Sequence, residues 1–114
     1  MFANSNVTDI TVSKKMTLIP ASQNLFIVDL HYIVSFDEIE PELDAHVEFL
    51  EENYASGCFI ASGPKVPRTG GVIVATAETK NALEQILAAD PFHAKKLAQY
   101  TVTEFRPSMK ASQL

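Results

Sequence analysis

The chain has 114 residues and a formal net charge of −5, with 46% hydrophobic and 20% charged residues. This length and composition predict one soluble globular domain with a small core. The excess of acidic residues argues against nucleic acid or an anionic membrane surface as the main partner. No apolar run approaches the roughly 18 residues that cross a bilayer, so a membrane partner is not expected either.

The cysteine content and the N-terminal residues predict a cytoplasmic protein. Cys58 is the single cysteine, so we expect no internal disulfide, which suits a reducing compartment, and a small buried strand residue at this position. The first residues lack the compact apolar segment of a signal peptide. We expect residues 1–24 to form a polar extension, residues 25–106 to form the domain, and residues 107–114 to form a frayed tail.

The stretch LFIVDLHYIV, residues 25–34, predicts the first strand. Its even positions are all apolar and predict one fully buried face. Its odd positions mix apolar side chains with Asp29 and His31, so the opposite face must also meet something other than water. We expect Asp29 and His31 to lie at a dimer interface or to line a cleft.

The stretch PELDAHVEFLEENYASG, residues 41–57, predicts a helix. Its apolar side chains recur at helical spacing, which predicts a buried stripe made of Leu43, Val47, Leu50 and Tyr54. Pro41 suits the first turn, and Gly57 suits the C-terminal stop.

The connection ASGPKVPRTGG, residues 61–71, lies between two predicted strands, CFIAS and GVIVATA. It is longer and stiffer than a plain hairpin requires, and it carries Lys65 and Arg68. We expect it to form one wall of a ligand cleft and to hold Arg68 over that cleft, because the guanidinium fork suits a carboxylate or phenolate. The alternative is that both cations are simply solvated.

The stretch TKNALEQILA, residues 79–88, predicts a second helix with Thr79 as its N-cap. The DPF that follows should break it, because the residue before a proline is pushed out of helical conformation. A last strand follows over residues 98–105. The resulting order, β-α-β-β-α-β, is typical of the ferredoxin-like α+β fold, with two helices on one face of a four-stranded antiparallel sheet. The bare sheet face predicts a homodimer formed through that face.

The spacing "H…FL…G.FIASGP..PRTGGVI…DPF…Y.V.EF" resembles the YciI (YCII-related) family from about Leu25 to Arg106. The resemblance implies a dimeric α+β barrel, in which two bare sheet faces close on one another. It also implies an active site built around His46 and Asp90, with Ser62 often counted with them. A few relatives act on small cyclic or aromatic compounds, one of them as a dehydrochlorinase of a chlorinated hydroquinone, and the wider superfamily includes muconolactone isomerase.

Each candidate residue also has a purely structural interpretation. His46 falls at the edge of the predicted helix stripe, where it either lines a cleft as an acid or base or makes a structural hydrogen bond. Asp90 either caps the turn before its proline or orients the imidazole, and both roles can hold at once. Ser62 is either a turn residue or a hydrogen-bonding partner of a substrate. It lacks a G-x-S-x-G elbow, so we do not expect a covalent nucleophile.

The preferred interpretation is a homodimer that binds a small molecule and carries out lyase- or isomerase-type acid–base chemistry on a cyclic or aromatic compound. His46 would move a proton, Asp90 would orient it, and the substrate would be held by Ser62, Gly63, Pro64 and Arg68. No dinucleotide or flavin fingerprint is present, so no organic cofactor is expected. His93 follows Asp90 by three residues without any metal-site spacing around it, so no metal is expected. The alternative is a non-catalytic ligand-binding or accessory dimer that uses the same cleft, and whether the protein is an enzyme stays open.

Overall fold

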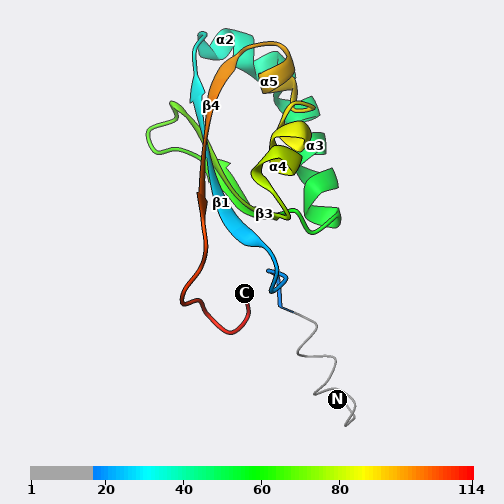
Figure 1. The fold of residues 1–114 in the computed structure, drawn as a ribbon. Coiled ribbons are helices and arrows are strands. Elements are labelled where there is room, and N and C mark those ends of the chain that lie inside the picture. The colour runs from blue at the N-terminus through cyan, green and yellow to red at the C-terminus, as the bar shows by residue number, and fades with distance from the viewer. Residues whose placement is uncertain (1–16) are drawn as a thin grey trace, which may run out of the picture.

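The computed structural model describes residues 17–114, and their elements follow the order predicted for a ferredoxin-like α+β fold (Figure 1). That fold class is confirmed. Two short helices and one 3₁₀ helix add to the two predicted helices. The elements are β1 (Asn24–Tyr32), α2 (Phe36–Ile39), η2 (Glu40–Glu42), α3 (Leu43–Ala55), β2 (Phe59–Pro64), β3 (Gly70–Ala77), α4 (Lys80–Leu87), α5 (Pro91–Ala94) and β4 (Ala98–Phe105).

The four strands form one antiparallel sheet in the order β2-β3-β1-β4. β1 lies in the middle of the sheet, where it pairs with β3 from Asn24 to His31 and with β4 from Leu25 to Tyr32. The helices all lie on one side of this sheet (Figure 1). The fold therefore has two layers, and one face of the sheet is left uncovered within a single chain.

The core lies between the helices and the inward face of the sheet. Alternate residues of β1 face the helices because successive side chains in a strand point to opposite sides. Phe26, Val28 and Leu30 are accordingly buried, and they pack in one cluster with Leu83 of α4 and Phe92 of α5. The outward residues Ile27 and Asp29 are only half-buried and His31 is exposed, which leaves them on the uncovered face.

The side of helix α3 that faces the core differs from the side predicted from its apolar stripe. Phe49 is its one buried residue, and its ring packs edge-on against Phe59 with 5.6 Å between centroids. Val47 and Tyr54, expected to be buried, are 45% and 38% exposed. Because the largest apolar side chain of the helix takes the core position, the predicted stripe runs along the edge of the core.

The expected long connection at residues 61–71 is a short hairpin. β2 continues to Pro64 and β3 begins at Gly70, so only residues 65–69 lie outside the strands, which is an ordinary hairpin length. Gly70 is required by close packing, since a Cβ atom there would lie 1.8 Å from the carbonyl oxygen of Leu30. The first residue of β3 therefore lies tightly against the end of β1, its neighbour in the sheet, and this contact positions the loop that carries Arg68.

Other local predictions match the structure at the level of single residues. Thr79 caps α4, because its hydroxyl oxygen accepts a hydrogen bond from the backbone N–H of Ala82 at 3.0 Å. β4 covers the predicted residues 98–105. α4 ends at Leu87 with Ala88 as its C-cap, before the Asp90-Pro91 pair, and Asp90 caps the short helix α5.

The two ends of the described chain pair with one another. The backbone N–H groups of Leu18 and Ile19 donate to the carbonyl oxygens of Gln113 and Leu114, and the side chain of Ile19 is buried. This pairing differs from the frayed tail expected from the sequence. Residues 1–16 of the expected extension lie outside the described residues. Within residues 17–114, no helix is both long and apolar enough to cross a membrane.

Candidate active site

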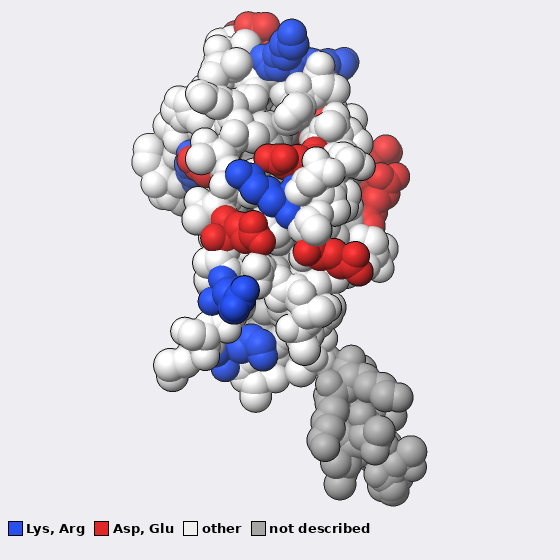
Figure 2. Space-filling model, in the orientation of Figure 1, with Lys and Arg blue, Asp and Glu red and all other residues white. Residues whose placement is uncertain are grey.

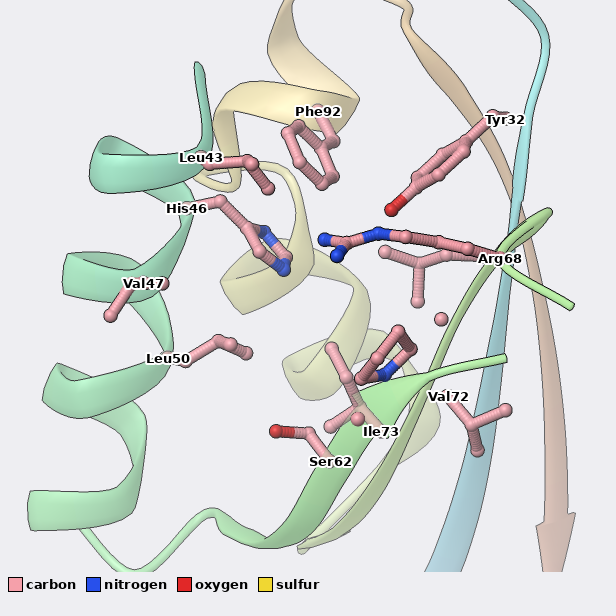
Figure 3. Close-up of a pocket in the computed structure, with 14 residues that line it drawn as sticks. Tyr32, Leu43, His46, Val47, Leu50, Ser62, Arg68, Val72, Ile73 and Phe92 are labelled. Carbon is pink, nitrogen blue, oxygen red and sulfur yellow. The ribbon is translucent and has the colours of Figure 1, made fainter. Parts of the chain in front are cut away.

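A cavity of about 150 Å³ lies between α3 and the β2–β3 hairpin (Figure 3). Its walls are mostly apolar, and a few polar groups converge on it, which is the usual composition of a small-molecule site. His46 and all four residues proposed from the sequence to bind substrate line it. The lining residues are Leu30, Tyr32, Leu43, His46, Val47, Leu50, Ser62, Gly63, Pro64, Arg68, Gly71, Val72, Ile73 and Phe92.

His46 projects from α3 into the wall of the cavity and is held in a fixed orientation. Its Nδ1 atom lies 2.9 Å from Oδ1 of Asp90. Its ring stacks on the ring of Phe92, with 4.1 Å between centroids and 9° between planes. Within residues 17–114, no hydrogen bond involves its other ring nitrogen, Nε2. The imidazole is therefore anchored on one side and free to interact on the other.

Asp90 does not line the cavity, because it lies fully buried behind His46. Its Oδ1 accepts a second hydrogen bond from the backbone N–H of Phe92 at 3.0 Å, and its Oδ2 accepts one from the hydroxyl of Tyr100 at 2.5 Å. Burying a carboxylate is costly unless it is paired and hydrogen-bonded, and these three donors meet that requirement. An ionised carboxylate only accepts, so opposite it a neutral His46 ring would carry its proton on Nδ1 and leave a lone pair on Nε2.

Tyr100 is a partner of this pair that the sequence reasoning missed. Burial raises the pKa of its phenol well above the ordinary value, and the neighbouring charge of Asp90 and their hydrogen bond raise it further. The phenol therefore stays protonated and keeps donating to Asp90. A signal was available, because position 100 faces the helices in the predicted last strand and a buried tyrosine usually has a partner for its hydroxyl.

The substrate-binding candidates on the hairpin take two different positions, one at the cavity wall and one on the loop. Ser62 lies at the cavity wall with its Oγ atom 2.6 Å from the hydroxyl oxygen of Tyr54, a contact that the sequence did not indicate. Gly63 and Pro64 complete the same wall. Arg68 extends from the loop toward His46, with Tyr32 on its other side (Figure 3).

Arg68 and Lys65, the two cations of the hairpin, have different environments. The Arg68 guanidinium carbon lies 5.0 Å from the centroid of the Phe36 ring, a cation–π distance. The Lys65 ammonium instead forms an ion pair with Asp29, whose strand position faces away from the helices. Within the part of the chain that the structure describes, no ion pair involves Arg68. Only one of the two cations is therefore available to the cavity.

The remaining polar candidates lie outside the cavity. Asp29 and His31 occupy the uncovered sheet face, so of the two roles expected for them, lining this cleft does not apply. His93 is exposed and contacts the Tyr100 ring edge-on at 5.0 Å. Among residues 17–114, no group of three or more potential metal ligands gathers at one place. Cys58 is half-buried, and this burial raises the pKa of its thiol.

A model of the YCII-related domain matches residues 17–106. The chain belongs to the YCII-related family. The match begins before residue 25 and so reaches into the segment that the sequence suggested was an extension. A comparison with proteins of curated function finds no significant match.

The solved structures that are similar to this chain include the following two. One is the 5-chloro-2-hydroxyhydroquinone dehydrochlorinase of Burkholderia phenoliruptrix AC1100 in complex with 2,5-dihydroxybenzoquinone. It has a TM-score of 0.63 and 20% sequence identity, over 72% of this chain and 93% of that chain. The other is a conserved protein of Methanosarcina mazei Go1, with a TM-score of 0.48 and 12% identity over 75% of this chain and 94% of that chain. At this identity the dehydrochlorinase supports the fold alone.

The Tyr100 hydrogen bond predicts a pH-dependent effect of the substitution Tyr100→Phe. At neutral pH the variant should be less stable by about 1–3 kcal/mol, because Asp90 loses a buried donor. In the wild type, the unfolded phenol ionises near its ordinary pKa of 10.0 while the folded phenol keeps its proton. The contribution of Tyr100 is therefore complete below pH 10 and declines as the pH rises further.

Urea unfolding of both proteins between pH 7 and about pH 11 measures this contribution. The stability difference should be constant up to about pH 9 and should narrow above pH 10. A difference that stays constant across the range would contradict the assignment. The assignment would also be contradicted if the folded wild type showed a phenolate absorbance near pH 10 that the folded Tyr100→Phe variant lacks.

Proposed function

We propose that this member of the YCII-related family is a cytoplasmic enzyme that transfers protons on a small cyclic or aromatic compound, in a lyase- or isomerase-type reaction. The observation that carries this proposal is the orientation of His46. Its Nδ1 is committed to Asp90, while its ring forms part of the cavity wall with Nε2 unpaired among residues 17–114. An imidazole held in this way is equipped as a general base and then as a general acid.

In the proposed reaction, Nε2 of His46 accepts a proton from the substrate and the imidazole becomes an imidazolium. The buried charge of Asp90 stabilises that imidazolium without accepting the proton. The proton then returns to a different atom of the substrate, which gives an isomerisation, or leaves with a departing group, which gives an elimination. Tyr100 keeps its own proton throughout and holds Asp90 in position.

The cavity size supports a substrate with a single ring. In another protein, an apolar cavity of about 150 Å³ binds benzene, and the volume here is about the same. The similar dehydrochlorinase was solved with 2,5-dihydroxybenzoquinone, which is also a single ring. We propose that Ser62, Gly63, Pro64 and Arg68 hold the substrate while His46 acts on it.

The first test is turnover of 5-chloro-2-hydroxyhydroquinone, followed as chloride release, together with uptake of solvent deuterium into a panel of small ring compounds. Wild-type protein should be active in at least one assay, and His46→Gln should lose about 100-fold or more of that activity. Binding of 2,5-dihydroxybenzoquinone should persist in His46→Gln.

Activity retained in His46→Gln would contradict the role of the imidazole. Wild-type protein that binds ring compounds but exchanges no proton with any of them would favour the alternative function, a non-catalytic ligand-binding or accessory protein. His93→Gln is the matched control, because His93 is exposed and lies outside the cavity, and its activity should be unchanged.

We further propose that the protein acts as a homodimer through the uncovered face of the sheet. The outward residues Ile27, Val72 and Val74 form an apolar strip in the middle of that face and are only half-buried in one chain. Phe105 of β4 is 42% exposed on the same face. An apolar face of a two-layer fold is normally covered, and a second copy would cover it.

Sedimentation at micromolar concentration should report twice the mass of one chain. The substitution Val74→Lys should yield monomers, because it introduces a charge in the middle of the proposed interface. Ala88→Lys, on the helical layer, is the matched control and should remain dimeric. A monomeric wild type, or a dimeric Val74→Lys, would contradict an interface at this face.

A further inference from the structure

We propose that the substrate is a single-ring phenol or enol, and that the cavity binds it as the ring oxyanion with the charged oxygen between Arg68 and Nε2 of His46. This inference rests on the proposed function, because it places the substrate in the same cavity. It specifies in addition that the bound substrate is negatively charged and that a ring oxygen carries this charge.

The charge follows from the residues that line the cavity. Arg68 is the only lysine, arginine, aspartate or glutamate among them. Asp90 lies behind His46, and its charge is already matched by three hydrogen-bond donors. The outer surface of α3, by contrast, carries acidic side chains along the edge of the molecule (Figure 2). An anionic ligand in the cavity would therefore meet one positive charge that no carboxylate of residues 17–114 neutralises.

The position of Arg68 is supported on several sides. The Phe36 ring lies beneath its guanidinium at 5.0 Å. The loop that carries it is tied to β1 by a hydrogen bond of 3.0 Å from the N–H of Tyr32 to the carbonyl of Thr69, and by the tight packing of Gly70 on Leu30. The Arg68 side chain is exposed, but its anchored backbone and the Phe36 ring limit the positions open to its guanidinium, which lowers the conformational freedom lost when it binds an oxyanion.

The neighbouring imidazole assigns the charge to a ring oxygen. The Arg68 guanidinium extends toward His46 inside the cavity (Figure 3), so an oxygen bound to Arg68 also lies beside the group that moves protons. A ring hydroxyl there would lose its proton to Nε2, and Arg68 would stabilise the anion as it develops. A carboxylate is already ionised at neutral pH and would give His46 no proton to accept.

The test uses 4-nitrophenol, whose yellow phenolate form is visible by absorbance, and 4-nitroanisole, which has the same ring but cannot ionise. The wild type should bind 4-nitrophenolate more tightly than 4-nitroanisole and should shift free 4-nitrophenol toward the phenolate form. Arg68→Met should weaken phenolate binding by about 10- to 100-fold, the loss expected for a charge-assisted hydrogen bond, and should leave 4-nitroanisole binding unchanged.

Arg106→Met is the matched control, because Arg106 follows β4 at the opposite end of the sheet from the hairpin, and it should bind both probes like the wild type. Arg68→Gln provides a second variant if Arg68→Met folds poorly. Equal affinity of the wild type for the two probes, or phenolate binding unchanged in both Arg68 variants, would overturn the inference. Benzoate that competes as strongly as 4-nitrophenolate would overturn the assignment of the charge to a ring oxygen.

These binding measurements do not depend on turnover. If turnover depends on His46 but the wild type binds 4-nitrophenolate no more tightly than 4-nitroanisole, this inference is refuted and the proposed function stands. If the wild type binds 4-nitrophenolate more tightly than 4-nitroanisole but His46→Gln keeps full activity, the proposed function is refuted and the charge of the ligand is still established.

Discussion

The buried carboxylate of Asp90 is the constraint on which the rest of the site depends. It lies with no exposed surface where the helical layer meets the sheet, and it accepts hydrogen bonds from His46 on α3, from the backbone of Phe92 in α5 and from Tyr100 on β4. A carboxylate in such a place destabilises the fold if any of these donors is lost. The same three bonds therefore join helix to sheet and orient the imidazole.

The shape of the cavity follows from this junction and from the tight pairing of the start of β3 with the end of β1. Asp90 holds His46 on one side of the cavity. On the other side, the close approach of Gly70 to the Leu30 carbonyl sets the direction of the loop that carries Arg68. The two polar groups thus come from segments that are distant in sequence and are brought together by the tertiary structure. Of the four residues named for the proposed interface, Val72 also lines this cavity, whereas Ile27, Val74 and Phe105 do not. The substitution Val74→Lys therefore tests assembly at a residue outside the cavity lining.

The local patterns of the chain predicted most of the fold, because strand alternation, a threonine cap and a proline stop are properties of a few neighbouring residues. The orientation of α3 was not predictable in this way, since several apolar side chains competed for the core and only packing against Phe59 selects Phe49. His46, Asp90, Ser62 and Arg68 could be identified as candidates from their motifs. For Tyr100 the strand pattern indicated a buried phenol but not its partner, and the contacts of Tyr32 and Tyr54 could not be assigned, because the partner in each case is set by tertiary packing.

We infer that Asp90 fixes the tautomer of His46, and ¹⁵N NMR of the imidazole can measure that tautomer in solution. In the wild type, at a pH where the ring is neutral, the account predicts a proton on Nδ1 and a bare Nε2. The same experiment on Asp90→Asn should show this preference weakened or reversed, because the amide no longer provides an acceptor of the same strength. His31 and His93 serve as internal references in both spectra. A wild-type ring protonated on Nε2, or tautomer populations that do not respond to Asp90→Asn, would contradict the account.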